Sequence, residues 1–217
     1  MIANLSRGLK RLGCDTSGVA LIEFAFAMPI LMVLGLTGAE LTHYITTRMR
    51  VSQVALHLAD NSARIGTGSQ LAAKTITETD INDLLTGAGL HAGELDLYTH
   101  GRVVISSVEP VAKPNTTNRF KIAWQRCRGA HGYAPQYGEQ GDTNLVGVGP
   151  VGQQVIAPDN GAAMFVEVAY RYQPLIDADL APNLEIREVA SMLVRDTRDL
   201  RQIYNNENAE ESSCDDD

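Results

Sequence analysis

Hydrophobic residues dominate one stretch near the start of the chain. The stretch from Val19 to Ala39 has 21 residues, and Glu23 is its only ionisable side chain. As an α-helix it would be about 31 Å long, which matches a bilayer hydrocarbon core of about 30 Å. The pattern therefore predicts a membrane-spanning helix.

The helical pattern continues beyond this apolar stretch. Apolar residues recur at spacings of three and four between Leu41 and Leu58, and Gly66 then provides a stop signal. One helix of about 45 residues explains both halves. A cleaved secretory signal is the competing interpretation, because Ala25-Phe26-Ala27 has the small-x-small form of a cleavage site. The apolar pattern that continues past this tripeptide favours a membrane anchor.

The polar and apolar pattern after Gly66 predicts one α+β domain. A short helix is expected after an N-cap at Thr77 or Thr79 and before Gly87 and Gly89. Enrichment in β-branched and aromatic residues predicts four strands, at 102–111, 120–125, 163–172 and 186–194. The expected fold is a long N-terminal helix packed on an antiparallel sheet.

Two details of this domain are also predicted. The first two strands are expected to pair as a hairpin, and the Gly- and Pro-rich residues 126–160 to form a long surface loop with at most one short strand near Val155. Within 163–172, alternation predicts one apolar face and one polar face that includes Glu167 and Arg171. Residues 205–217 are polar and acidic, and we expect them to be poorly ordered unless they are tied down.

Composition agrees with this organisation, since 44% hydrophobic and 20% charged residues are typical of a globular protein. The expected segments are a leader (1–18), the long helix (19–66), an exported domain (67–204) and an acidic tail (205–217). Arg7, Lys10 and Arg11 oppose only Asp15 in the first segment, so the positive-inside rule leaves that end in the cytoplasm. The remainder has 15 basic and 25 acidic residues, which does not favour nucleic acid as a partner.

The acid inside the apolar stretch requires a partner. A carboxylate within a membrane span costs a few kcal/mol by insertion scales and is a functional-site hypothesis by default. No Lys or Arg lies between Val19 and Ala39. Cleavage of the chain just before Val19 would supply a cation, because the new α-amino group is positively charged at neutral pH. Gly18 is a small, flexible residue that a protease could accept there.

These residues resemble a known family. Gly18 followed by Val19-Ala20-Leu21-Ile22-Glu23-Phe24 is similar to the prepilin-peptidase site of type IV pilin-like proteins. The wider pattern resembles the TadE-like minor pseudopilins of the tight-adherence (Tad) pilus system, through Gly18, Ala20, Glu23, Phe24, Pro29 and Glu40.

The resemblance implies a single-pass protein of a bacterial inner membrane, with a pilin-like roll in the periplasm. It implies cleavage between Gly18 and Val19 by a dedicated aspartic prepilin peptidase, and a role in the assembly or structure of a Tad/Flp-type adhesive pilus. Partners implied are other pilins and pseudopilins, through the N-terminal helix, and the inner-membrane assembly platform. Glu23 would pair with the mature N-terminus of a neighbouring subunit, and Pro29 fits a kinked spanning helix whose neighbours re-satisfy the freed carbonyl.

Cysteines give a further prediction. Cys14 lies in the leader, so cleavage would leave Cys127 and Cys214 as an even pair in an exported domain. An oxidising compartment allows these two residues to form a disulfide, and two unpaired thiols are the alternative.

Catalytic constellations are not evident. The five histidines have no metal-ligand spacing among themselves or with cysteine, and no set of nucleophile, base and orienting group suggests itself. The sequence therefore predicts neither an enzyme nor a metal or other cofactor. The alternative function is an uncleaved, signal-anchored envelope domain that binds a ligand, surface or membrane protein through residues 126–160. Only the pseudopilin hypothesis needs both Gly18 and Glu23.

Overall fold

The computed structural model describes residues 17–68, 72–176 and 184–215. The predicted leader therefore lies outside the described residues, except for Ser17 and Gly18. The chain divides into two compact units, with the boundary between Tyr44 and Ile45. Helix α2, which runs from Ser17 to Ser62, contributes to both units, and each unit is described by itself below.

Helix α2 confirms the long helix predicted from the apolar pattern, with 46 residues. In the first unit, α2 is long and apolar enough to cross a membrane. In the second unit, one stripe of α2 is buried: Val51, Val54, Ala55, Leu58 and Ala59. The spacing of three and four in this stripe is that of an amphipathic helix against a core.

The C-terminal end of α2 is capped by a distant arginine. Arg198 is 9% exposed and donates hydrogen bonds to the carbonyl oxygens of Ser62 (3.0 Å) and Ile65 (2.9 Å). Carbonyls at a helix C-terminus lack intrahelical partners, and a cation there also favours the helix dipole. Burial lowers the pKa of Arg198 to about 10, so the side chain keeps its charge at neutral pH.

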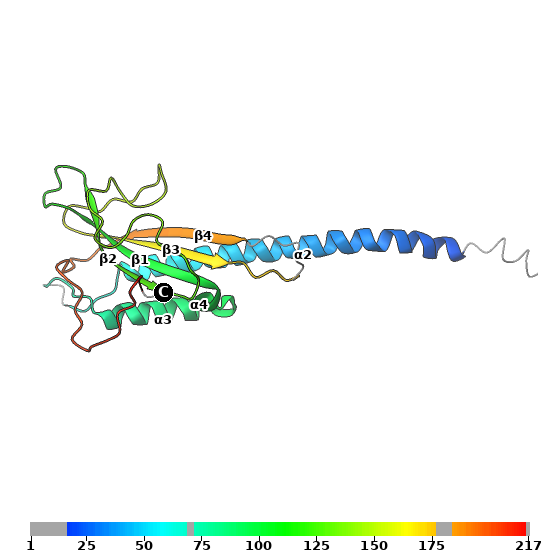
Figure 1. The fold of residues 1–217 in the computed structure, drawn as a ribbon, viewed down its shortest axis with the longest axis horizontal. Coiled ribbons are helices and arrows are strands. Elements are labelled where there is room, and N and C mark those ends of the chain that lie inside the picture. Colours follow the sequence, from blue (N-terminus) through cyan, green and yellow to red (C-terminus); the bar gives the residue numbers. More distant parts are fainter. Residues whose placement is uncertain (1–16, 69–71, 177–183, 216–217) are drawn as a thin grey trace, which may run out of the picture. The chain divides into compact units, whose positions relative to one another are not determined.

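The second unit contains a four-stranded antiparallel sheet with the order β2-β1-β3-β4 (Figure 1). The strands are β1 (Gly101–Pro110), β2 (Phe120–Arg128), β3 (Ala163–Arg171) and β4 (Glu185–Leu193). The predicted hairpin of the first two strands and the final antiparallel strand are confirmed. The long helix and the sheet confirm the predicted α+β fold class.

Three short helices precede the sheet: α3 (Glu78–Ala92), η1 (Gly93–Leu95) and α4 (Leu97–His100). Thr77 is the N-cap of α3 and forms a capping box with Asp80, as one of the two predicted caps. The prediction that Gly87 and Gly89 end this helix is wrong. The helix ends at Ala92, and Gly93 is its C-cap with φ 57°. Gly89 instead allows the Tyr98 ring to approach, since a Cβ there would lie 2.6 Å from that ring.

The sheet is covered on both faces, which corrects two predictions about its polar side. Glu167 on β3 is 1% exposed, because residues 133–137 fold over it. It accepts hydrogen bonds from the Tyr133 hydroxyl (2.8 Å) and the Gln136 amide (3.0 Å). The segment predicted as a surface loop therefore covers the sheet, and its Val148 and Ala157 join Phe165 of β3 in a hydrophobic cluster. Val148 and Val155 pair in an isolated bridge.

Candidate functional site

The first candidate site is the N-terminal part of α2, which holds the predicted cleavage and assembly residues. Gly18 and Val19 lie in its first turn, and Glu23, Phe24 and Pro29 follow within the helix. Every residue from Gly18 to Ala39 is exposed within the unit except the half-buried Met28. An apolar surface of this extent around a whole helix is suited to lipid or to other helices rather than to water.

Charge is placed sparsely along this helix. Glu23 is exposed on an otherwise apolar surface, and Glu40 is half-buried where that surface ends. Residues 19 and 23 are separated by four positions, so both lie on one side of the helix. A helical side chain also tilts toward the N-terminus, which directs the Glu23 carboxylate toward the start of the helix.

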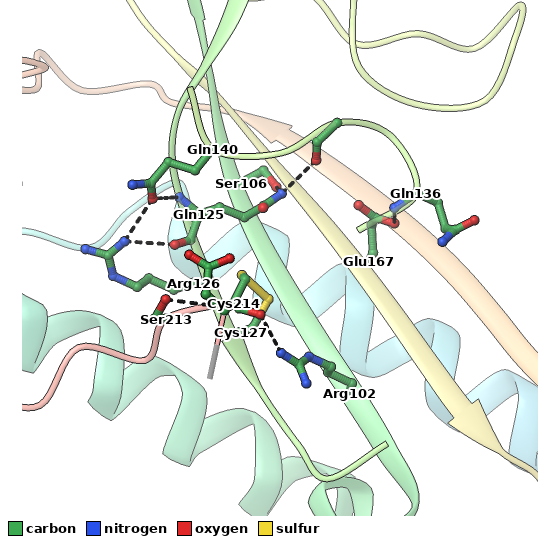
Figure 2. Close-up of a disulfide and its surroundings, with 12 residues drawn as sticks. Arg102, Ser106, Gln125, Arg126, Cys127, Gln136, Gln140, Glu167, Ser213 and Cys214 are labelled. Carbon is green, nitrogen blue, oxygen red and sulfur yellow. Dashed lines mark hydrogen bonds between the residues drawn. A yellow bond between two sulfur atoms is a disulfide. The ribbon is translucent and has the colours of Figure 1, made fainter. Parts of the chain in front are cut away.

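The second candidate site is the disulfide between Cys127 of β2 and Cys214 of the C-terminal tail (Figure 2). The two residues are 87 positions apart in sequence and have a Cα–Cα distance of 4.8 Å. Cys127 packs with Val104, Tyr133 and Ala169 in a small hydrophobic cluster. The structure thus contains the pairing that the sequence offered as one of two alternatives.

The tail, residues 205–215, is tied across three elements in succession. The Glu210 carbonyl accepts from the side chain of Asn82 on α3 (2.7 Å), and the Ser212 carbonyl accepts from the Cys127 amide on β2 (2.8 Å). The Cys214 carbonyl accepts from Arg102 on β1 (3.0 Å), as Figure 2 shows. A polar tail of this composition is expected to be ordered only if other parts of the protein hold it, and these contacts do so.

Arginine side chains of β2 join the tail to α3. Arg126 is 5% exposed and forms a two-pronged ion pair with Glu78 in the first turn of α3, and it also lies 2.9 Å from Glu211 of the tail. Arg128 donates to Asn82 (2.9 Å) and to the Ser212 hydroxyl (3.3 Å). An arginine fork held by two carboxylates fixes both partners in orientation as well as in distance.

Sequence reasoning found some of these residues and missed others. The predicted residues of α2 all lie on one helix, and Cys127 and Cys214 meet in the second unit. Arg126, Glu78 and Arg198 were not predicted. Glu78 had a weak signal, because it follows the capping threonine at a position where acids favour the helix dipole. The other two meet partners that lie far away in sequence, and no local pattern indicates such contacts.

Metal-ligating chemistry has no support in the part of the chain that the structure describes. No group of three or more His, Cys, Asp or Glu side chains there is arranged to hold a metal ion. The rings of His57 and His91 pack edge to face, with their centroids 4.4 Å apart. No acid or thiol among the described residues completes a metal-ligand set with them.

Comparison with known proteins identifies the N-terminal segment. Residues 18–60 match the family model described as TadE-like protein. This match confirms the resemblance predicted from the residues around Gly18 and Glu23, and it connects the chain with the Tad pilus. No curated protein and no solved structure matches the chain.

Proposed function

We propose that this protein is a minor pseudopilin that a prepilin peptidase cleaves between Gly18 and Val19 and that acts in the assembly or structure of a Tad/Flp-type adhesive pilus. The observation that carries the proposal is the TadE-like match over residues 18–60, which begins at the glycine before the proposed cut. Within this match, residues 18–39 form an apolar stretch of helix that is exposed around its circumference except at the half-buried Met28.

The proposed topology is a single pass, with residues 1–18 in the cytoplasm and the domain from residue 67 onward in the periplasm. The basic residues before the apolar stretch support this orientation through the positive-inside rule. The disulfide supports it as well, because disulfides persist in oxidising compartments such as the bacterial periplasm. Partners in this proposal are the prepilin peptidase, other pilins and pseudopilins, and the inner-membrane assembly platform.

Cleavage gives Glu23 a chemical role. The new α-amino group of Val19 would carry a positive charge in a membrane segment that has no Lys or Arg from Val19 to Ala39. Glu23 would then neutralise the α-amino group of a neighbouring subunit as the helices pack together. Phe24, Pro29 and Glu40 would complete the surface that the peptidase and the neighbouring helices recognise.

Replacement of Gly18 by leucine is expected to block processing, because a bulky side chain replaces the one residue without a Cβ at the proposed cut. Co-expression of the unchanged chain with a cognate prepilin peptidase should yield a mature protein that starts at Val19. Intact-mass measurement of the membrane fraction distinguishes the two products. Gly38→Leu, which changes another glycine of the same exposed helix, is the matched control and should be cut normally.

Two results would contradict the proposal. Retention of Met1 in the unchanged chain would favour an uncleaved, anchored envelope domain. A cut after Ala27 would identify the apolar stretch as an ordinary secretory signal.

Replacement of Glu23 by glutamine is expected to leave processing largely intact and to weaken association with pilus partners. The substitution removes a charge-assisted contact worth about 1.5 to 3 kcal/mol, or roughly one to two orders of magnitude in affinity. Cysteine cross-linking along α2 in membranes, quantified against the unchanged chain, measures the association.

Glu94→Gln is the control, since it changes an acid that is 91% exposed and lies outside α2, and its cross-linking yield should equal that of the unchanged chain. Equal cross-linking yields for the Glu23→Gln variant and the unchanged chain would show that Glu23 does not pair between subunits. Because residues 19 and 23 share a side of the helix, that result would leave pairing within one subunit as the explanation.

A further inference from the structure

An open cleft lies between the β1–β2 edge of the sheet and the C-terminal segment 198–205. It consists of two adjoining hollows of about 650 and 690 Å³. Both hollows are lined by Glu109 at the end of β1, Lys121 at the start of β2 and the residues 198–201. The lining lies entirely within the second unit and is separate from the disulfide and from the apolar part of α2.

The hollow of about 650 Å³ has equal numbers of acidic and basic side chains. Its acids are Glu78, Glu109, Asp199 and Glu211, and its bases are Lys121, Arg126, Arg198 and Arg201. Most of them are already paired, since Arg126 binds both Glu78 and Glu211, and Arg201 binds Asp199 at 2.7 Å. Such a wall gives little net attraction to a ligand that carries a strong charge of either sign.

Glu109 is the acid of this wall with unused hydrogen-bonding capacity. Its side chain is almost fully buried, and among the described residues it accepts one hydrogen bond, from the Ser107 hydroxyl at 3.3 Å. Lys121 lies 3.8 Å away and is 41% exposed, so this ion pair is long and partly solvated. A carboxylate has about four acceptor positions, and burial raises the pKa of the Glu109 carboxyl in spite of Lys121 and the Ser107 hydroxyl.

Trp124 supplies the aromatic part of the same wall. It is the single tryptophan of the chain, it is half-buried, and it lines the hollow of about 650 Å³. A register shift between Ser107 and Val108 brings Trp124 opposite Ser107, the residue that donates to Glu109. A bulge of this kind re-aims the side chains next to it. The side chain of Trp124 makes no hydrogen bond to the described part of the chain, which leaves its indole N–H available.

We propose that this cleft binds a neutral saccharide, with one sugar ring stacked on Trp124 and its hydroxyl groups donating to Glu109. A pyranose ring offers an apolar C–H face for an aromatic surface and hydroxyls along its edge for a carboxylate. Lys121 and the amides of Gln140 and Gln202, which also line the hollow, provide donors for the sugar oxygens. This combination of an apolar surface with a few polar groups is typical of a small-molecule site.

The test uses the fluorescence of Trp124, which reports on the cleft without interference because the chain has no other tryptophan. The full chain is purified in a detergent without a sugar headgroup. It is titrated with D-glucose, D-galactose and N-acetyl-D-glucosamine up to about 100 mM, since a single-ring ligand of this kind is expected to bind with a Kd of roughly 1 mM or weaker. A saturable change with at least one of these sugars is the expected result.

Substitutions separate a built site from a general solvent effect. Glu109→Gln is expected to raise the half-saturating sugar concentration about tenfold, because it removes a charged acceptor. Lys121→Gln changes a partly exposed residue of the same wall and is expected to weaken binding as well. Glu94→Gln changes an acid that is 91% exposed outside the cleft, and it should bind like the unchanged chain. Trp124→Ala is followed by calorimetry and should abolish binding.

Each variant is used only if its disulfide and far-UV circular dichroism match those of the unchanged chain. Absence of a saturable change with all three sugars would overturn the proposal, and so would equal half-saturation in the Glu109→Gln variant. L-argininamide and inorganic phosphate serve as ionic probes. If L-argininamide or phosphate has a lower half-saturating concentration than the sugar that binds most tightly, the cleft is an ion site and the proposal is wrong.

Discussion

Replacement of Cys214 by serine is expected to lower the free energy of unfolding by about 4 to 5 kcal/mol in the chain-entropy model. The bond closes a loop with a sequence separation of 87 residues, so its loss frees a large part of the unfolded chain. The tail, which contacts α3, β2 and β1, would also lose its covalent bond to β2. We therefore expect the contacts of Ser212 and Glu211 with the β2 arginines to weaken with it.

Urea unfolding of the full chain, followed by Trp124 fluorescence and far-UV circular dichroism, measures this change. Cys127→Ser should lower the free energy of unfolding by a similar amount. The variant that carries both substitutions should be as stable as either single variant, since each substitution breaks the same bond. Cys14→Ser is the matched control, because it changes the cysteine that does not take part in this bond. A loss below about 1 kcal/mol in the Cys214→Ser variant would contradict the expectation.

Thiol labelling gives an independent check on protein exported without reductant. Cys127 and Cys214 should label only after reduction, because both sulfur atoms are held in the bond. If both residues label fully before reduction, the disulfide is absent from the exported protein and the tail is held by hydrogen bonds and ion pairs alone.

The elements of this fold could be predicted where a local pattern determines them. The apolar run fixes α2, β-branched residues mark all four strands, and the capping box at Thr77 marks the start of α3. These signals lie within a few residues of the feature that they specify. The proposed cleavage and assembly residues Gly18 and Glu23 rest on a local pattern of the same kind, since their spacing within one helix is the signal.

The misses have a common physical cause, which is a partner distant in sequence. Glu167 looks like part of a solvent-facing side of β3, and it is buried because Tyr133 and Gln136 fold over it. Gly89 looks like a helix stop, although it provides space for the ring of Tyr98. Arg126 looks like a surface cation, because nothing near it in sequence reveals Glu78 or Glu211.

Replacement of Arg126 by methionine is expected to lower the free energy of unfolding by about 3 to 5 kcal/mol. The substitution keeps an unbranched but shorter and apolar side chain, and it removes the cation that neutralises Glu78, whose side chain is 5% exposed. A buried carboxylate without its partner bears the full cost of lost hydration. The same urea experiment measures the loss.

A second substitution separates charge from packing. Glu78→Met in the Arg126→Met background is expected to recover much of the stability, because an apolar pair replaces a buried ion pair at small net cost. Arg64→Met is the matched control, since it breaks an exposed pair with Asp60 in which the arginine is 63% exposed. That change should cost no more than about 1 kcal/mol.

The comparison between single and double variants decides what Arg126 does in this domain. Recovery in the double variant would show that the large loss in the Arg126→Met variant comes from the carboxylate left behind. If the double variant is as unstable as Arg126→Met alone, charge neutralisation of Glu78 is not the cause. The stabilising contacts would then be the bonds from Arg126 to Glu211 and to Gln140, which hold the tail and residues 133–140 against β2. In that case Glu211→Gln should cost more than the roughly 1 kcal/mol expected of a half-exposed partner.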